Sequence, residues 1–468
     1  MALGKRKEKQ ASLWVETSQL QVRGRHPFYS RLNEVLDRAK FDAYAERICR
    51  KYYAETMGRP SLAPGIYFRC FLIGYFEGID SERGIAYRVS DSLSLREFLG
   101  LSLEEQTPDH STLSKTRRLM SLGTHKAVFR WVLRRLAAEG LLSGKNLGVD
   151  ATTLEANAAL RSIVRRDNGD GYDEHVARLM QAEGTGETTP AARQRFDRRR
   201  KKSLSNRDWV NPHDREARIA KMKDGRTHLA YKAEHAVDLQ TGALVALTIQ
   251  PGDCGDTASM RTMLAEAGRA VAERAGQKAE AAGRVEAVSE VGVVADTGYH
   301  SKDSVRDLTE VGVRTVIAEP ERKRQKWDGQ SAAQAAVYAN RRRLNTNRAK
   351  ALMRRRGELI ERSFAHLYDT GGMRRVHLRG KQNIAKRALI HAAAFNLSLI
   401  LRRMLRVGTA RQAADILAAL CYALLRLIED LETIYADRNA VPTPVHTISP
   451  PPRRRCAPSA KRTLSTGC

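Results

Sequence analysis

The sequence predicts an α/β domain, built as a mixed sheet flanked by helices, with an all-α region before it. Apolar residues recur every three or four positions over residues 27–140, which is typical of amphipathic helices. From about residue 145, short apolar runs that suit strands alternate with helical segments. The order strand, hairpin, helix, strand, helix, strand, helix describes one sheet with helices packed against it.

The helical region is expected to span residues 26–144, after a basic N-terminal arm over residues 1–25. Within it, Pro108 and Asp109 precede hydroxyl residues and a basic run, which predicts a helix start. The first turn of that helix could face a phosphate backbone, as in a helix-turn-helix recognition helix; an ordinary capped helix with a solvated basic face is an equal alternative. The candidate DNA contacts are Ser111, Thr112, Lys115, Arg117 and Arg118.

The α/β domain is expected to span residues 145–406. A polar, basic stretch over about residues 161–226 interrupts it and is interpreted as an inserted mobile loop or a small subdomain that orders on a polyanion. Residues 228–249 predict a hairpin around a turn at Gly242. The charge run in the insertion is interpreted as non-specific phosphate contacts, made by Arg198, Arg199, Arg200, Lys201 and Lys202.

The C-terminal part is expected to form a helix over residues 407–440 and a disordered, basic, Pro-rich tail over residues 441–468. The most membrane-like stretch covers residues 388–405. It contains His391, Asn396, Arg402 and Arg403, so it is interpreted as a buried helix and not as a membrane span.

Composition indicates an anionic partner and a reducing compartment. The 468 residues include 81 Lys and Arg against 53 Asp and Glu, a formal net charge of +28, which favours nucleic acid as the partner. The six cysteines form neither a C-x-x-C pair nor a zinc-ligand pattern, and no apolar segment follows the basic N-terminus. We therefore expect a cytosolic protein without a secretory signal.

Three carboxylates carry the predicted chemistry. Asp150 and Asp296 each stand at the carboxyl end of a short apolar run, and Glu361 lies on a later predicted helix, residues 347–368. Carboxylates from distant segments suit a hard cation such as Mg²⁺, and two such cations can hold the attacking and leaving oxygens of a phosphodiester. Taken singly, a strand-end aspartate often caps a helix and a helical glutamate usually faces solvent. Their order in a basic chain favours the metal site.

The chain resembles the DDE transposases of bacterial insertion sequences. The resemblance lies in residues 148–152, Gly-Val-Asp-Ala-Thr; residues 295–299, Ala-Asp-Thr-Gly-Tyr; and residues 360–367, Ile-Glu-Arg-Ser-Phe-Ala-His-Leu. Residues 26–29, 58–61, 74–78 and 92–100 look like the InsH-type N-terminal domain of these proteins. The similarity covers roughly residues 26–406.

This resemblance implies a ribonuclease-H-like catalytic domain that binds two Mg²⁺ or Mn²⁺ ions. Asp150 would bridge both ions, Asp296 would hold one and Glu361 the other. The implied activity is binding to terminal inverted repeats, strand cleavage by water, and transfer of the freed 3′ ends into target DNA. The implied partner is double-stranded DNA, on which the protein would form a homo-oligomer. We expect it in the bacterial cytoplasm, associated with the nucleoid, and not in a membrane.

The sequence departs from the family near the glutamate, so only Glu361 itself is carried over. Many relatives have a Tyr-x2-Arg-x3-Glu-x6-Lys signature, whereas this chain has Arg354, Gly357 and Tyr368 at or next to the other positions. Glu358 stays open as the alternative third carboxylate.

Two further alternatives concern a tryptophan and the activity itself. Trp327, among basic residues, could stack on an extruded base or simply anchor a surface loop. The alternative functions are a ribonuclease-H-like nuclease without strand transfer and a non-catalytic DNA-binding derivative. The presence of all three carboxylates counts against the second of these.

Overall fold

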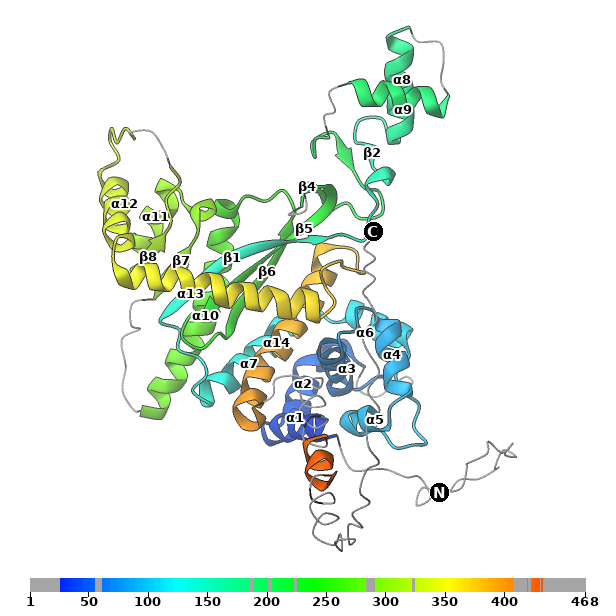
Figure 1. Cartoon of the computed structure of the whole chain (residues 1–468), viewed down its shortest axis with the longest axis vertical. Coiled ribbons are helices and arrows are strands. Elements are labelled where there is room, and N and C mark those ends of the chain that lie inside the picture. The colour runs from blue at the N-terminus through cyan, green and yellow to red at the C-terminus, as the bar shows by residue number, and fades with distance from the viewer. Residues whose placement is uncertain are drawn as a thin grey trace, which may run out of the picture. The chain divides into compact units, whose positions relative to one another are not determined.

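Figure 1 shows a computed structural model of the chain, which forms two compact units, Met1–Ala414 and Asp415–Cys468. The structure describes residues 26–54, 61–184, 189–200, 204–222, 225–282, 291–321, 325–406, 419, 422–429 and 431. The basic arm predicted over residues 1–25 and the tail predicted over residues 441–468 lie outside this described part.

The N-terminal region is helical, as predicted. Side chains of Ser81, Ser92, Asp109 and Ser121 each accept a hydrogen bond from a backbone N–H of the helix that follows them, which satisfies donors that the first turn leaves open. The helices are α1 (Pro27–Arg38), α2 (Phe41–Cys49), α3 (Pro64–Glu77), α4 (Glu82–Ser90), α5 (Leu93–Leu99), α6 (His110–Leu119) and α7 (Leu122–Ala138).

The second region contains a mixed sheet in the order β6-β5-β1-β7-β8. The strand β5 runs antiparallel to both β1 and β6, whereas β7 is parallel to β1 and to β8. Three consecutive antiparallel strands followed by two parallel ones give the sheet expected of a ribonuclease-H-like domain. The strands are β1 (Asn146–Glu155), β5 (Thr227–Asp238), β6 (Leu244–Pro251), β7 (Gly292–Ala295) and β8 (Arg314–Ile317), and β4 (Arg218–Lys221) pairs with the start of β5.

The predicted hairpin is confirmed as β5 and β6. Gly242 lies in the turn with φ +78°, a left-handed conformation that favours glycine. Residues that follow each other along β5 face opposite sides of the sheet: Glu234 contacts Ser259 in α10 (Asp256–Ala282), and His235 contacts Ser363 in α13 (Asn347–Phe364). The helices α10 and α13 therefore cover the two faces.

The helix α14 (Lys381–Leu405) connects the sheet to the N-terminal helices, because it packs against β6, α3 and α7. It is the one helix of the described chain with the length and composition of a membrane span, yet 94% of its apolar window is buried inside the protein. The interpretation of residues 388–405 as a buried helix is confirmed. The apolar side chains of both regions form one continuous core.

The insertion after β1 forms a small subdomain and not an open loop. A short ribbon of β2 (Val164–Arg165) and β3 (Trp209–Val210) carries α8 (Tyr172–Ala182) and α9 (Pro190–Arg199). The two helices enclose their own apolar cluster of Val176, Met180 and Ala192, with Tyr172 and Phe196 packed against it. Figure 1 shows α8 and α9 crossing each other beyond the β4 end of the sheet.

The remaining helices complete the C-terminal half. Two of them, α11 (Lys302–Glu310) and α12 (Ser331–Leu344), pack on each other and on β8. The helix predicted over residues 347–368 is confirmed as α13, continued by one π-helical turn over Ala365–Thr370. In the second unit, residues 419, 422–429 and 431 are helical, within the segment predicted as a C-terminal helix.

Candidate active site

Asp150 lies in the middle of β1, and the prediction that it ends a strand is wrong. The strand continues to Glu155 because the residues after Asp150, two of them β-branched threonines, pair antiparallel with β5. The parallel pairing with β7, however, stops at Gly148 and Val294. Continuing that register by two residues sets Asp150 beside Asp296, so Asp150 still lies where the parallel strands end.

Asp296 directly follows β7 and caps the short helix Thr297–Tyr299. Its Oδ1 accepts a hydrogen bond of 2.9 Å from the backbone N–H of Gly298. The capping role considered for strand-end aspartates is therefore present here. It uses Oδ1 and leaves Oδ2 without a hydrogen bond among the described contacts.

Asp150 is partly buried and faces charges of both signs. Its Oδ1 accepts from the backbone N–H of Ala151 at 2.7 Å, and its Oδ2 accepts from Arg356 Nη1 at 2.8 Å. Burial raises the pKa of Asp150 and the negative charge of Asp296 adds to this, although Arg356 acts in the opposite direction. Two carboxylates that repel each other in a partly buried place make a favourable position for a cation.

Glu361 lies on α13 with its side chain exposed, and its carboxylate has no partner among the described residues. The stripe predicted to pack this helix is confirmed, because Ile360, Phe364 and Leu367 are all buried. Within the described part of the chain, no three His, Cys, Asp or Glu side chains converge closely enough to hold a metal ion. The structure thus brings Asp150 and Asp296 together and leaves Glu361 apart from them.

A buried histidine fixes α13 on the sheet. His235 Nδ1 lies 2.8 Å from Ser363 Oγ and its Nε2 lies 2.7 Å from the hydroxyl of Tyr368. Burial lowers the pKa of His235 to about 3, so the ring is neutral and suited to these uncharged partners. Because Ser363 is two residues from Glu361, this contact also sets the position of the predicted third carboxylate.

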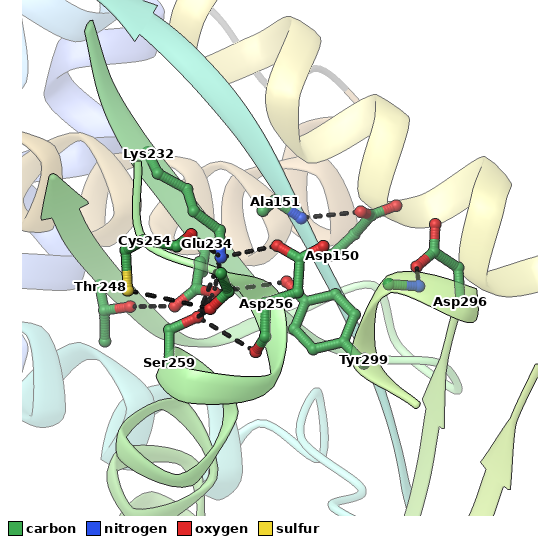
Figure 2. A network of polar contacts seen from close by, with 12 residues as sticks. Asp150, Ala151, Lys232, Glu234, Thr248, Cys254, Asp256, Ser259, Asp296 and Tyr299 are labelled. Atoms are coloured by element: carbon green, nitrogen blue, oxygen red, sulfur yellow. Dashed lines mark hydrogen bonds and ion pairs between the residues drawn. The ribbon is translucent and has the colours of Figure 1, made fainter. Parts of the chain in front are cut away.

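A buried polar network lies next to the two aspartates, as Figure 2 shows. Lys232 Nζ lies 2.6 Å from Asp256 Oδ1 and 2.9 Å from Glu234 Oε1. Glu234 also accepts hydrogen bonds from Thr248 Oγ1 at 3.0 Å and from the hydroxyl of Tyr299 at 3.4 Å. Although burial opposes it, hydrogen bonding to the two carboxylates raises the pKa of Lys232 and keeps it charged.

Tyr299 connects this network to the candidate metal ligands. Burial raises its pKa most, followed by the negative charges of Glu234, Asp256, Asp150 and Asp296. Gly298 lies beside it, and a Cβ at that position would overlap Asp256 Oδ2, so a larger residue would displace the Asp256 carboxylate. Sequence analysis missed this network. The available signal was two oppositely charged residues, Lys232 and Glu234, at alternate positions of a strand in which apolar residues predominate.

The predicted contacts on α6 differ in their exposure. The helix begins at His110 with Asp109 as its cap, as predicted, and Ser111, Lys115 and Arg118 are exposed while Thr112 is half-buried. Arg117 is different: it is 5% exposed and its Nε lies 2.6 Å from Glu82 Oε1. The prediction of Arg117 as a DNA contact is corrected, because this side chain holds α6 to α4.

The described residues of the basic run in the insertion also differ in their exposure and in their partners. Arg198 and Arg199 are exposed at the end of α9, whereas Arg200 lies 2.8 Å from Asp197 Oδ1 and donates to the hydroxyl of Tyr172. Lys201 and Lys202 lie outside the described residues. The run remains a predicted phosphate contact, with Arg200 partly engaged inside the subdomain.

Trp327 is half-buried and has partners on the two helices next to its loop, α11 and α12. Lys302 Nζ lies 4.4 Å from the centre of its ring, and the ring of Tyr338 lies 6.0 Å away. These contacts favour the alternative in which Trp327 anchors a surface loop. Stacking on an extruded base stays a prediction.

Comparison with known proteins identifies two transposase domains in the chain. Residues 17–119 match the family described as Transposase domain (DUF772), and residues 188–397 match the Transposase DDE domain. No curated protein sequence matches the chain. Among solved structures, the Mos1 mariner paired end complex with Mn shows 12% identity over 72% of this chain and 87% of that chain, with a TM-score of 0.18, too low to bear on the fold.

Together the two family matches cover more than half of the sequence, and the chain belongs to the DDE transposases. Members of this family are DNA-cleaving enzymes that generally use divalent metal ions.

Proposed function

We propose that this transposase binds the terminal inverted repeats of its element, cleaves the DNA there, and transfers the freed 3′ ends into target DNA. The observation that carries the proposal is the juxtaposition of Asp150 and Asp296 beside the end of the parallel strand pairing. The donor set fits a hard divalent cation, because it consists of carboxylate oxygens without cysteine or histidine ligands. Asp150, Asp296 and Glu361 would hold two Mg²⁺ or Mn²⁺ ions.

When bound, such ions lower the pKa of an attacking water and stabilise the charge that develops on the phosphodiester. The protein's own contribution is positional. Asp150 is held by the pairing of β1 with β5, Asp296 by its cap on the following turn, and Glu361 by the packing of α13. Because Glu361 lies apart from the aspartates, we propose that its exposed side chain turns toward them when metal and DNA bind.

We also propose double-stranded DNA as the partner and a homo-oligomer as the form bound to it, in the bacterial cytoplasm at the nucleoid. The net charge of +28 supports the first part, since each phosphate neutralised by Lys or Arg releases a counterion. Exposed Lys115, Arg118, Arg198 and Arg199 are candidate contacts.

The test is cleavage and joining of a labelled duplex that carries the element's end, in Mg²⁺ or Mn²⁺. We expect Asp150→Asn and Asp296→Asn each to lose at least about a thousandfold in cleavage rate, because a metal ligand is removed. DNA binding, measured in Ca²⁺, should stay within about twofold of the unaltered protein because phosphate contacts elsewhere remain. An Asp296→Asn protein that cleaves at the normal rate would refute the assignment. Cleavage without any joined product would favour the nuclease alternative.

A further inference from the structure

Arg356 is the cation that contacts Asp150 in this structure. It lies on α13, five residues before Glu361, and points toward β1. Its Nη1 lies 2.8 Å from Asp150 Oδ2 and 3.3 Å from the backbone oxygen of Val149. The side chain of Arg356 is 12% exposed and that of Asp150 is 26% exposed. A Cβ on Gly148 would come within 3.0 Å of Arg356 Cγ, so the glycine gives the arginine room to reach the aspartate.

The contact uses only part of the guanidinium. An arginine pairs best with a carboxylate through two parallel N–H bonds, whereas here a single nitrogen, Nη1, contacts Asp150. Arg356 Nε is buried and has no hydrogen-bond partner. A buried donor without an acceptor is unfavourable, and an additional anion at this place would satisfy it.

Metal binding at Asp150 and this ion pair compete for the same oxygen. Oδ1 of Asp150 already accepts the backbone N–H of Ala151, which the strand holds in place. Oδ2 is engaged by Arg356, which is a side chain and free to rotate. A carboxylate oxygen can accept more than one contact, but a guanidinium and a divalent cation on the same oxygen repel each other. Metal binding therefore favours release of the arginine, which is the contact that can move.

We propose that Arg356 is the built-in counter-ion of Asp150 in the metal-free protein, that a divalent cation displaces it, and that the freed guanidinium then binds a phosphate of the DNA. The proposal rests on the proposed metal site. Moving a partly buried guanidinium away from its carboxylate leaves an unpaired charge, unless a second anion takes over. A DNA phosphate at the site provides that anion. Metal and DNA therefore bind cooperatively, each raising the affinity of the other by the same factor.

The experiment measures Mn²⁺ binding to the full chain without DNA, by electron paramagnetic resonance of free Mn²⁺. The variant is Arg356→Gln, which keeps a hydrogen-bonding group but removes the competing charge. The matched control is Arg348→Gln, because Arg348 lies on the same helix eight residues earlier, is exposed, and has no partner among the described residues. We expect Arg356→Gln to bind Mn²⁺ roughly tenfold more tightly than the unaltered protein, within the range typical of coupled sites, and Arg348→Gln to change by less than about twofold.

The second measurement repeats the titration with saturating end duplex. DNA should raise the Mn²⁺ affinity of the unaltered protein and of Arg348→Gln, but not that of Arg356→Gln. Equal or weaker Mn²⁺ binding by Arg356→Gln without DNA would overturn the proposal and make Arg356 a support for the metal ligand. Thermal unfolding without metal shows whether Arg356→Gln is folded. If it is not folded, Arg356→Lys takes its place in the titrations, because lysine keeps the charge but loses the planar fork.

Asp150→Asn separates this inference from the proposed function. If Asp150→Asn binds Mn²⁺ as tightly as the unaltered protein, the metal site itself is wrong. If Asp150→Asn loses Mn²⁺ binding while Arg356→Gln has no effect, the metal site stands and the role of Arg356 is refuted.

Discussion

Glu358 and Glu361 are three residues apart on α13, but their side chains have different surroundings. Glu358 pairs with Arg362 at 2.8 Å, and both side chains are about half exposed, so the pair contributes little to stability. Glu361 has no such partner and adjoins the buried stripe of Ile360 and Phe364. A carboxylate beside a packed stripe is held on a more rigid part of the helix, which metal geometry requires.

We therefore expect Glu358→Gln to retain substantial strand cleavage and Glu361→Gln, of nearly identical volume, to lose about a thousandfold or more. Both variants are assayed on one labelled end duplex at saturating Mg²⁺, with DNA binding in Ca²⁺ as the control for folding. An inactive Glu358 variant beside an active Glu361 variant would transfer the role of third carboxylate to Glu358.

At the same scale, sequence analysis could predict Asp150 and Asp296 because each follows its own apolar run. It could not predict the partner of Asp150, since Arg356 is 206 positions away and their contact depends on how α13 packs on β1. Arg117 is a residue whose role was predicted wrongly for the same reason. Its basic neighbours made it look like a phosphate contact, and only the packing of α6 on α4 reveals Glu82 beside it.

Some helices and strands can be predicted from the local sequence pattern alone, whereas others depend on pairing with a distant strand. The hairpin of β5 and β6 and the helix α13 follow from turn chemistry and apolar spacing. The extent of β1 does not, because its second half is held by pairing with β5, which lies beyond an insertion of about 65 residues. Whether that insertion was a loop or a subdomain depended on one small apolar cluster, which its polar sequence conceals.

The exposed side of α13 carries a row of charges that ends at Glu361. At 100° per residue, Lys350, Arg354 and Glu361 fall within about 40° of one another, and at 1.5 Å per residue the cations lie about 6 Å apart along the axis. Lys350 and Arg354 are exposed and have no partner among the described residues. A DNA strand with one phosphate at the carboxylates would place further phosphates along this row.

We expect Lys350→Gln to weaken binding of end DNA and to reduce the slope of log affinity against log salt by about 0.9, the value for one phosphate contact on duplex DNA. The control is Arg348→Gln, which removes an equally exposed charge on the opposite side of the same helix. Fluorescence anisotropy over a salt series measures both. Identical slopes for the two variants would show that no strand follows this row.

At the scale of the whole molecule, the order of motifs was enough to predict the class of fold, whereas the nucleic-acid partner predicted from the net charge remains a proposal. Neither could reveal that the N-terminal helices and the sheet share one core through α14, because an apolar helix does not specify its neighbours. The predicted boundary at residue 144 consequently remains a prediction.

The second unit contains a helical segment whose apolar side chains are exposed. Leu424, Leu427 and Leu431 are 56–58% exposed. In the sequence, Leu417, Leu420 and Ile434 extend the same spacing, so that apolar residues alternate at three and four positions from 417 to 434. This heptad spacing is typical of a helix that pairs with another copy of itself. It supports the proposed homo-oligomer and names the segment that would form it.

We expect Leu424→Lys combined with Leu427→Lys to reduce the molar mass of the full chain, measured by light scattering, from oligomer to monomer, because charges in the seam prevent the helices from packing. The matched control is Leu425→Lys combined with Tyr422→Lys. These residues are 59% and 60% exposed on the same helix but lie outside the heptad positions, so this variant should keep the molar mass of the unaltered protein. If both pairs lower the molar mass equally, pairing through the heptad positions is refuted. The whole apolar surface of the helix would then contribute to association. If the unaltered chain is monomeric with and without end DNA, this segment does not join copies of the protein.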